Sequence, residues 1–492
     1  MMLRVRTIIQ AKGVLATGIV CVLAATWVCG EERKQRAPEV EMSLEVSPVW
    51  SGHPVGFFLL TKGERQYVAF YDQQRRMTVA MRTLDSKKWH YHRLGSTVGW
   101  DSHNYITMAI DADGYIHLSG NMHCDPLVYF RTTRPYDIHS FKRVPEMIGR
   151  QENRCTYPKF IRGTSGEFIF TYRDGGSGNG NQMYNVYDLK TKSWRRLLDT
   201  PLMDGQGKMN AYIVGPVRGP EGYFHICWVW RDTPNCYTNH DLCYARSKDL
   251  VHWETITGER ITLPITIDTK GIIVDPVPVK GGMINGNTRI GFDSKKRPIV
   301  SYHKFDKNGM TQAYNARWEN GRWKIYQTSD WNYRWYFQGG GCIRFEINVS
   351  GVILKKDGYL TQSYRHDKYG SGTWKLNEDT LKPIGEIEET PLWPRELKKL
   401  ESDFPGMQVR WLKDAGEDRD SNVQYLLRWE TLPVNRDRRR EIVPKPTMLR
   451  LYKLRYDLLK IEKQMKRTIT PNTRIRHFSH PKTSLRVPPK FH

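Results

Sequence analysis

The sequence predicts an all-β protein, specifically a seven-bladed β-propeller, on three observations. Seven segments open with a turn residue or a charge and then alternate apolar and polar residues as strands do. They follow one another at steps of 48, 52, 56, 75, 61 and 65 residues, measured from Val68, Ile116, Phe168, Phe224, Ile299, Leu360 and Tyr425. Many units end in a strand that closes on a tryptophan, at Trp89, Trp194, Trp253 and Trp323. No sustained helical period occurs before Arg395.

A repeated four-stranded unit of this length is typical of a propeller blade, and closing the blades into a ring removes exposed sheet edges. Two stacked β-sandwiches are the alternative, but they would not explain the recurring tryptophan. The turn at residues 247–253 resembles the Asp-box turn of sialidase-like blades. We expect a short helix within residues 391–400 and a strand at residues 448–454 that completes the last blade.

The N-terminus has the pattern of an export signal. Arg4, Arg6 and Lys12 precede an apolar run over residues 13–28, which is short for a membrane span. An uncleaved anchor is the alternative. We expect a signal peptide over residues 1–30, a charged linker over 31–44, the propeller over 45–455 and a basic, disordered tail over 456–492. The mature protein would then be a secreted or periplasmic monomer without a stable membrane span.

The charge of the chain points to an anionic partner. The net charge is +24, and residues 431–492 hold 17 Lys and Arg against 4 Asp and Glu. A basic exported protein suggests a polyuronate, a sulfated glycan or a membrane surface as partner, and of these we expect an acidic, uronate-containing polysaccharide with or without sulfate. Nucleic acid is not expected behind a signal peptide. Six cysteines remain after the signal is removed, too few in a chain of this size for disulfides to define the fold.

Residues 99–131 place two polar clusters at one end of a predicted hairpin. An Asp-Gly turn at Asp113 and Gly114 separates two β-forming segments, with His103 just before the first and His123 just after the second. An antiparallel hairpin therefore brings both imidazoles to the same end of the sheet. A lone buried histidine is more often a core residue, but two that converge beside Asp, Asn and Ser at strand ends favour a functional site.

These motifs, D-S-H-N-Y and then D-G-Y-I-H-L-S-G-N-M-H, resemble the propeller-type ulvan lyases and their neuraminidase-like-repeat relatives. The resemblance continues through T-Y-P-K-F at 156–160, Y-R-D-G-G at 172–176 and T-N-H-D at 238–241, and it covers roughly residues 45–455. It implies a catalytic set of two histidines, a tyrosine and an arginine. Matched motif by motif, these fall on His103, His123, Tyr157 and Arg173.

Chain cleavage at a uronate by β-elimination requires neutralisation of the carboxylate, a base for the C5 proton and an acid for the leaving O4. The resemblance implies Arg173 as the neutralising group, a role that suits the bidentate pairing of a guanidinium. It implies His123 or Tyr157 as the base–acid pair, and which imidazole does which work stays open. This chemistry requires no cofactor.

Two other functions are compatible with the sequence. A glycoside hydrolase acting on rhamnose–glucuronate linkages would use a pair of carboxylates, and Asp101, Asp125, Asp174 and Asp241 all lie near the motifs. A glycan-binding propeller without catalytic activity is the other alternative.

Further residues are expected to bind substrate or metal. The substrate-binding candidates are Asn104, Asn121, His240 and His303. His225 and Cys227 project from one face of a predicted strand, and Cys236 in the following loop could join them in a structural zinc site. The spacing matches no standard zinc motif, so a core histidine with buried thiols or a disulfide is the alternative.

Overall fold

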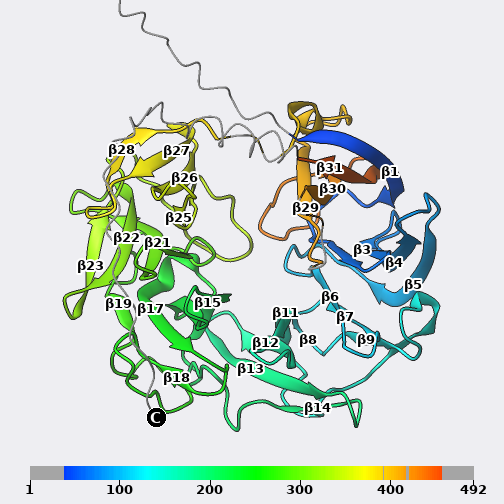
Figure 1. Cartoon of the computed structure of the whole chain (residues 1–492), viewed down its shortest axis with the longest axis horizontal. Coiled ribbons are helices and arrows are strands. Elements are labelled where there is room, and N and C mark those ends of the chain that lie inside the picture. The colour runs from blue at the N-terminus through cyan, green and yellow to red at the C-terminus, as the bar shows by residue number, and fades with distance from the viewer. Residues whose placement is uncertain (1–37, 390, 392, 417–419, 421, 457–492) are drawn as a thin grey trace, which may run out of the picture. The chain divides into compact units, whose positions relative to one another are not determined.

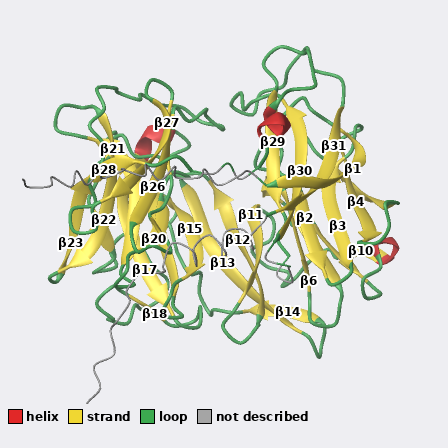
Figure 2. Cartoon of the chain, turned by 45° about the horizontal axis from the view of Figure 1, so that its top comes forward, coloured by secondary structure: helices red, strands yellow, loops and turns green. Residues whose placement is uncertain are grey.

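The structure, a computed structural model, describes residues 38–389, 391, 393–416, 420 and 422–456. Strands joined by loops make up nearly all of this part of the chain (Figure 2). The helical elements of the described residues are three short 3-10 helices, η1 (Ile138–Ser140), η2 (Cys236–Thr238) and η3 (Arg395–Lys398). The predicted all-β fold is confirmed, and the short helix expected within residues 391–400 is η3.

The strands form seven sheets, whose members are coloured in chain order in Figure 1. One sheet joins the two ends of the described chain in the order β1 (Glu39–Val49), β31 (Thr447–Arg455), β30 (Val423–Thr431) and β29 (Gln408–Lys413). The next contains β2 (Phe58–Lys62), β3 (Arg65–Tyr71), β4 (Arg76–Thr83) and β5 (His90–Thr97). A third contains β6 (Ile106–Ile110), β7 (Ile116–Gly120), β9 (Tyr129–Thr132) and β10 (Phe141–Arg143).

The remaining four sheets follow in the same way. The fourth contains β8 (His123–Asp125), β11 (Cys155–Arg162), β12 (Phe168–Gly176), β13 (Asn179–Asp188) and β14 (Ser193–Arg196). The fifth contains β15 (Asn210–Arg218), β16 (Phe224–Arg231), β17 (Asn239–Ser247), β18 (Trp253–Glu254) and β19 (Ile273–Asp275). The sixth contains β20 (Arg289–Phe292), β21 (Pro298–Phe305), β22 (Thr311–Glu319) and β23 (Arg322–Gln327). The seventh contains β24 (Ile347–Val349), β25 (Ile353–Leu354), β26 (Leu360–His366), β27 (Gly370–Leu376) and β28 (Pro383–Glu386).

The seven predicted strand segments each lie in a different sheet. They correspond to β3, β7, β12, β16, β21, β26 and β30. The recurring tryptophans stand at the last strands of their sheets: Trp194 in β14, Trp253 in β18 and Trp323 in β23, with Trp89 directly before β5. The pattern in the sequence therefore marks the strand at one end of the pairing order in four of the seven sheets.

The turn at residues 247–253 shows how such a tryptophan is fixed. The Ser247 hydroxyl accepts hydrogen bonds from the backbone N–H groups of Asp249 and Leu250. The Asp249 carboxylate in turn accepts from the N–H of His252 at 2.7 Å, and the indole of Trp253 donates to the Leu250 carbonyl. Trp253 is 1% exposed. A compact polar turn thus holds a large apolar side chain in the core.

The chain begins its first strand earlier than predicted. Strand β1 starts at Glu39 and pairs with β31 from Glu39↔Arg455 to Val49↔Thr447. The expected linker over residues 31–44 is therefore wrong beyond residue 38, because β31 offers a full edge for residues 39–44 to pair with. The strand expected at residues 448–454 is confirmed as part of β31.

The residue expected to begin the C-terminal tail is bonded to the folded domain. Tyr456, expected to begin the tail, donates its N–H to the Asn422 carbonyl and its hydroxyl to Gln424 Oε1 at 2.8 Å. The expected signal peptide (1–30) and the rest of the expected tail lie outside the described residues. Within the described part, no helix is long and apolar enough to cross a membrane. All six described cysteines are free thiols.

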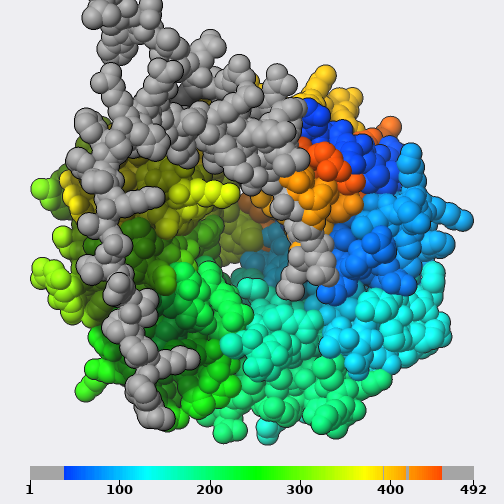
Figure 3. Space-filling view, in the orientation of Figure 1, coloured from blue at the N-terminus to red at the C-terminus, as the bar shows by residue number. Residues whose placement is uncertain are grey.

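Neighbouring sheets meet through their first strands, which determines where the site forms. Strand β6 contacts both β2 and β11, so the loops at the ends of these strands lie close together. In the space-filling view the sheets from blue to green surround a narrow opening near the centre (Figure 3). The candidate residues described below come from loops and strand ends of several sheets.

Candidate active site

Two histidines share one carboxylate. Asp101 and His103 lie in the loop before β6, and His123 is the first residue of β8. The Nδ1 atom of His103 is 2.5 Å from Asp101 Oδ1, and the Nδ1 atom of His123 is 2.5 Å from Asp101 Oδ2. The two imidazole centroids are 4.1 Å apart. The predicted convergence of His103 and His123 is confirmed.

The hairpin and its exit produce this geometry. Strands β6 and β7 pair in register from Ile106↔Gly120 to Ile110↔Ile116, so the residues before β6 and after β7 lie at the same end. Asn121 adopts a left-handed conformation, φ 60°, which turns the chain into β8. A side chain at Gly120 would come within 2.5 Å of the Tyr105 carbonyl, so this close approach requires glycine.

The shared carboxylate sets the charge of the pair. Burial disfavours the charged form of Asp101, but its hydrogen bonds to His103 and His123 outweigh burial and hold its pKa well below the usual range. Burial also disfavours the charged form of His103. Its hydrogen bonds to Asp101 and Cys342 outweigh that effect and raise the pKa of His103 to about 10. His103 is therefore charged at neutral pH.

Tyr157 and Arg173 lie beside the histidines. The Tyr157 ring centroid is 5.8 Å from that of His103 and 6.4 Å from that of His123. The guanidinium carbon of Arg173 lies 4.9 Å from the centre of the same tyrosine ring. Tyr157 has a left-handed backbone, φ 58°, at the irregularity in the pairing of β11 with β12, and this conformation distinguishes it from its neighbours in the strand. All four predicted catalytic residues are therefore brought together.

Arg173 is buried with unused donors. The residue is 2% exposed, and its Nε donates to the Gly175 carbonyl at 3.0 Å. Its Nη1 and Nη2 atoms are buried and have no close hydrogen-bond acceptor among the described residues, although the Tyr212 hydroxyl interacts with the guanidinium. Burial disfavours the charged form, but the neighbouring Tyr157 and Tyr212 outweigh it and raise the pKa of Arg173. A buried charge with two free donors is costly unless a ligand supplies the acceptors.

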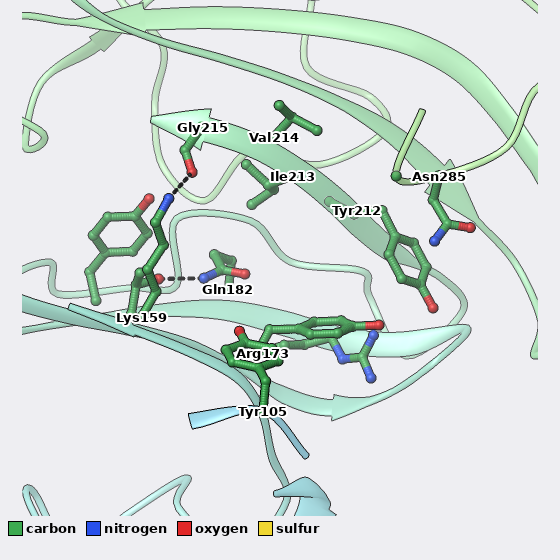
Figure 4. Close-up of a pocket in the computed structure, with 14 residues that line it drawn as sticks. Tyr105, Lys159, Arg173, Gln182, Tyr212, Ile213, Val214, Gly215 and Asn285 are labelled. Carbon is green, nitrogen blue, oxygen red and sulfur yellow. Dashed lines mark hydrogen bonds between the residues drawn. The ribbon is translucent and has the colours of Figure 1, made fainter. Parts of the chain in front are cut away.

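A cavity of about 350 Å³ adjoins the guanidinium. Its lining includes Tyr105, Tyr157, Lys159, Arg173, Gln182, Tyr212 and Asn285. Figure 4 shows Tyr212 directed from β15 toward Arg173, and Lys159 bonded to the Gly215 carbonyl at the other side of the cavity. Aromatic walls with a few convergent polar groups are typical of a site for a sugar.

The pKa values of the two tyrosines next to Arg173 are shifted in opposite directions. Burial raises the pKa of Tyr157 well above its ordinary value, so its hydroxyl keeps its proton. Burial also disfavours ionisation of Tyr212, but Arg231 and Arg173 outweigh burial and lower its pKa. The guanidinium carbon of Arg231 is 5.4 Å from the Tyr212 ring centre. Sequence reasoning missed Tyr212, because no motif distinguishes it from the other tyrosines of the strands.

Three of the four expected substrate-binding residues lie at or near the surface, each in a different environment. Asn121 lies beside His123 and donates its side-chain amide to Ser96 and Thr97. Asn104 is 8% exposed next to His103. His240 has both ring nitrogens engaged, with Asp241 at 2.8 Å and Asp232 at 2.9 Å. Whether these three contact substrate stays a prediction.

The prediction for His303 is wrong. The residue is 1% exposed in the interior of β21, and its ring packs 5.1 Å from that of Trp335. Burial lowers the pKa of His303 to about 4. Consecutive residues of β21 up to His303 are buried on both faces of the strand, so this side chain lies in the core, where a polysaccharide cannot reach it.

The predicted metal set of His225, Cys227 and Cys236 is also wrong. His225 stands near the start of β16 with its Nδ1 atom 2.6 Å from the Tyr244 hydroxyl, whereas Cys236 follows the far end of that strand in η2. Cys227 and Cys236 are buried in different hydrophobic clusters. Among the described residues, two groups have three ligand atoms close enough for one ion: Asp101, His103 and His123, and His103, Cys342 and Asp437.

Asp437 and Cys342 were not predicted and come from distant parts of the chain. Asp437 Oδ1 accepts hydrogen bonds from the N–H and hydroxyl of Ser102 and lies 3.2 Å from His53 Nε2. Its other oxygen accepts from the N–H of Cys342 at 2.8 Å. The Sγ atom of Cys342 is 3.4 Å from His103 Nε2. The loop that carries His103 is thereby held by two segments more than two hundred residues away in sequence.

Sequence comparisons give the family and two related enzymes. The model for BNR repeat-containing family members matches residues 65–331. The short isoform of the ulvan lyase of Alteromonas sp. (strain LOR) is 30% identical over 131 residues, which span 25% of this chain and 25% of that protein. The ulvan lyase PL25 of Pseudoalteromonas sp. (strain PLSV) is 22% identical over 376 residues, 63% of this chain and 73% of that protein. The match therefore spans about a quarter of the Alteromonas enzyme and most of the Pseudoalteromonas enzyme.

Solved structures share the fold. The crystal structure of the polysaccharide lyase Uly1 superposes with a TM-score of 0.56 at 13% identity, covering 85% of this chain and 100% of that chain. A PL25 ulvan lyase bound to -[GlcA(1-4)Rha3S]- superposes with a TM-score of 0.55 at 13% identity, covering 85% of this chain and 98% of that chain. At this identity the likeness establishes the fold alone.

Proposed function

Since the chain belongs to the BNR repeat-containing family, we propose that it is a polysaccharide lyase that cleaves a uronate-containing, ulvan-like polysaccharide by β-elimination. Two relatives named as ulvan lyases support this proposal, one of them over 73% of its own length. The substrate would be acidic, in keeping with the net charge of +24.

The free donors of Arg173 carry the proposal. A uronate carboxylate entering the cavity would accept from the buried Nη1 and Nη2 atoms, which have no close acceptor among the described residues other than the interacting Tyr212 hydroxyl. Pairing with the guanidinium neutralises the carboxylate and so makes the C5 proton of the sugar more acidic. This interaction strengthens as negative charge builds up on the carboxylate in the transition state.

Two different residues near Arg173, His123 and Tyr157, carry out the two proton transfers. His103 is charged and cannot accept a proton, which leaves His123 as the base for the C5 proton. With Nδ1 of His123 bonded to Asp101, its Nε2 is the atom to receive it. Tyr157 keeps its proton and donates it to O4 as the C4–O4 bond breaks and the C4–C5 double bond forms. No cofactor takes part in these steps.

We also infer that the seven sheets are the seven blades of one propeller. The pairing of β1 with β31 supports this, because it brings the first and last strands of the described chain into one sheet. Export of the protein, and its action as a monomer, remain proposals drawn from the sequence.

The test is incubation of the purified protein with a panel of acidic polysaccharides that includes ulvan, alginate and a pectic polyuronate. We expect ulvan to be cleaved, with growth of the ultraviolet band of a C4–C5 unsaturated uronate in step with new reducing ends. New reducing ends without that band would support the hydrolase alternative. Binding without cleavage would support the glycan-binding alternative.

A further inference from the structure

The loop that carries Cys342 presents a thiol to the outer nitrogen of His103. The Cys342 Sγ and His103 Nε2 atoms are 3.4 Å apart. Zinc binds thiolate at about 2.3 Å and imidazole at about 2.0 Å, so one ion bonded to both atoms would have a bond angle close to tetrahedral. The donor pair therefore has the separation that a zinc ion requires without movement of either side chain.

The inner nitrogen of His103 is arranged as in metal-bound histidines. Its Nδ1 atom is 2.5 Å from the Asp101 carboxylate. A histidine that binds a metal through one nitrogen commonly donates the other N–H to a carboxylate, which fixes the ring and increases its basicity. Asp101 would fulfil this role for an ion on Nε2.

Asp437 provides a third donor. Its carboxylate lies with His103 and Cys342 in a group whose ligand atoms are all within 4.8 Å of one another. The N–H groups of Ser102 and Cys342 both donate to this carboxylate and so hold it in place. Nitrogen, sulfur and oxygen from three residues, with water in a fourth position, make a common zinc coordination set.

The alternative group of Asp101, His103 and His123 is less suited to an ion. Both of its histidines already direct Nδ1 at Asp101 at 2.5 Å, so an ion between them would replace two charge-assisted hydrogen bonds. The group with Cys342 keeps both of these bonds.

We propose that His103, Cys342 and Asp437 form a regulatory site for a thiophilic divalent cation such as zinc, and that its occupation inhibits the enzyme. The inhibition rests on the proposed function, whereas the binding does not. On binding, the Cys342 thiol and the Nε2–H group of the charged His103 each release a proton to solvent, and the sulfur–metal and nitrogen–metal bonds form. The ion fixes His103 and places new positive charge and bulk beside the Tyr157 ring, where substrate would approach.

Cobalt is a suitable probe because thiolate coordination gives it a charge-transfer band in the near ultraviolet. The full-length protein, freed of metal with a chelator, is titrated with cobalt as wild type, as Cys342→Ser and as Cys124→Ser. Cys124 is the matched control, since it is the other described cysteine that is not buried and it follows His123 directly. Circular dichroism of each variant verifies that it is folded.

We expect the thiolate band in the wild type and in Cys124→Ser, and its loss in Cys342→Ser. Asp101→Asn should keep the band but weaken cobalt binding by about 10- to 100-fold, because it removes the carboxylate behind the ligating ring. A wild type without the band, or a band that survives Cys342→Ser, would overturn the site.

Inhibition is measured separately, with zinc, on cleavage of ulvan. The wild type and Cys124→Ser should be inhibited and then recover with chelator, while the activity that Cys342→Ser shows without metal should not fall when zinc is added. Cobalt binding without zinc inhibition would overturn the regulatory role. If no variant cleaves ulvan but the cobalt band behaves as expected, the proposed lyase function fails and the metal site stands.

Discussion

The imidazole rings of His103 and His123 lie with their centroids 4.1 Å apart and their planes tilted by 33°, close enough that two positive charges would repel one another strongly. Asp101 lies against the Nδ1 atoms of both rings and offsets this repulsion. The Asp101 carboxylate thus fixes the positions of both rings and keeps His103 charged. Its loss should affect catalysis through the positions and protonation states of both histidines.

Asp101→Asn should lower kcat by about a hundredfold or more, with a smaller change in KM, because a misplaced acid or base affects the transition state more than substrate binding. Steady-state kinetics on ulvan measure both constants. The control is Asp113→Asn, which alters an exposed carboxylate in the turn between β6 and β7. An unchanged kcat in Asp101→Asn would show that the shared carboxylate does not position the catalytic groups.

Arg173→Lys should lose most activity although the charge is kept. An ammonium group cannot reproduce the planar pair of donors that the two free nitrogens of Arg173 offer to a carboxylate. We expect kcat/KM to fall by at least about a hundredfold. The matched change Arg154→Lys, at an exposed arginine just before β11, should leave kcat/KM near the wild-type value. Equal losses in the two variants, or full activity in Arg173→Lys, would show that the reaction does not depend on the planar donor pair of Arg173.

Tyr157→Phe should abolish product formation while binding persists, since the lost proton transfer belongs to the transition state. The expected loss in kcat is about a hundred- to ten-thousandfold. Binding of ulvan oligosaccharides by calorimetry provides the second measurement. A variant that binds and still cleaves would remove Tyr157 from the mechanism.

Tyr212→Phe should extend activity to higher pH. The pKa of Tyr212 is lowered by Arg231 and Arg173, and the tyrosinate that forms above it would pair with Arg173 and compete with the substrate carboxylate. Wild-type kcat/KM should therefore fall as pH rises through the lowered pKa of Tyr212, and the fall should move to higher pH in the variant. Superimposable pH profiles would contradict this relation.

The His103–Asp101 pair should make stability depend on pH in the alkaline range. Because the folded pKa of His103 is raised to about 10, its contribution is complete below the unfolded histidine pKa of about 6.5 and is lost as pH rises toward 10. Thermal unfolding followed by circular dichroism should show a melting temperature that declines over this range. The decline should be shallower in Asp101→Asn, and identical slopes would contradict the pairing.

The hairpin and its two histidines could be predicted because their information is local. An Asp-Gly turn and alternating residues fix the pairing of β6 with β7, and that pairing brings His103 and His123 together. Asp437 and Cys342 could not be found in this way, since they meet His103 only through the arrangement of distant sheets. The sequence carries no short-range signal for such contacts.

The errors have a similar origin. A period of two along β16 correctly put His225 and Cys227 on one face, but it could not say that the face is packed core and that Cys236 lies beyond the other end of the strand. His303 follows mostly apolar residues in β21. Its place in the sequence does not show that its side chain is only 1% exposed. Strand periodicity predicts on which face of a sheet a residue lies, but it does not predict what packs against that face.

The central claim is that this protein breaks a glycosidic chain by elimination rather than by hydrolysis, and isotopically heavy water tests it most directly. The protein is incubated with ulvan in water enriched in the heavy isotope of oxygen, and the masses of the fragments are measured by mass spectrometry. Elimination adds no water, so the fragments should carry no heavy oxygen from the cleavage step and should include a uronate end lighter by one water. Cleavage that adds one water in total across each broken bond, with heavy oxygen in one of the two new ends and no uronate end lighter by one water, would contradict the lyase mechanism.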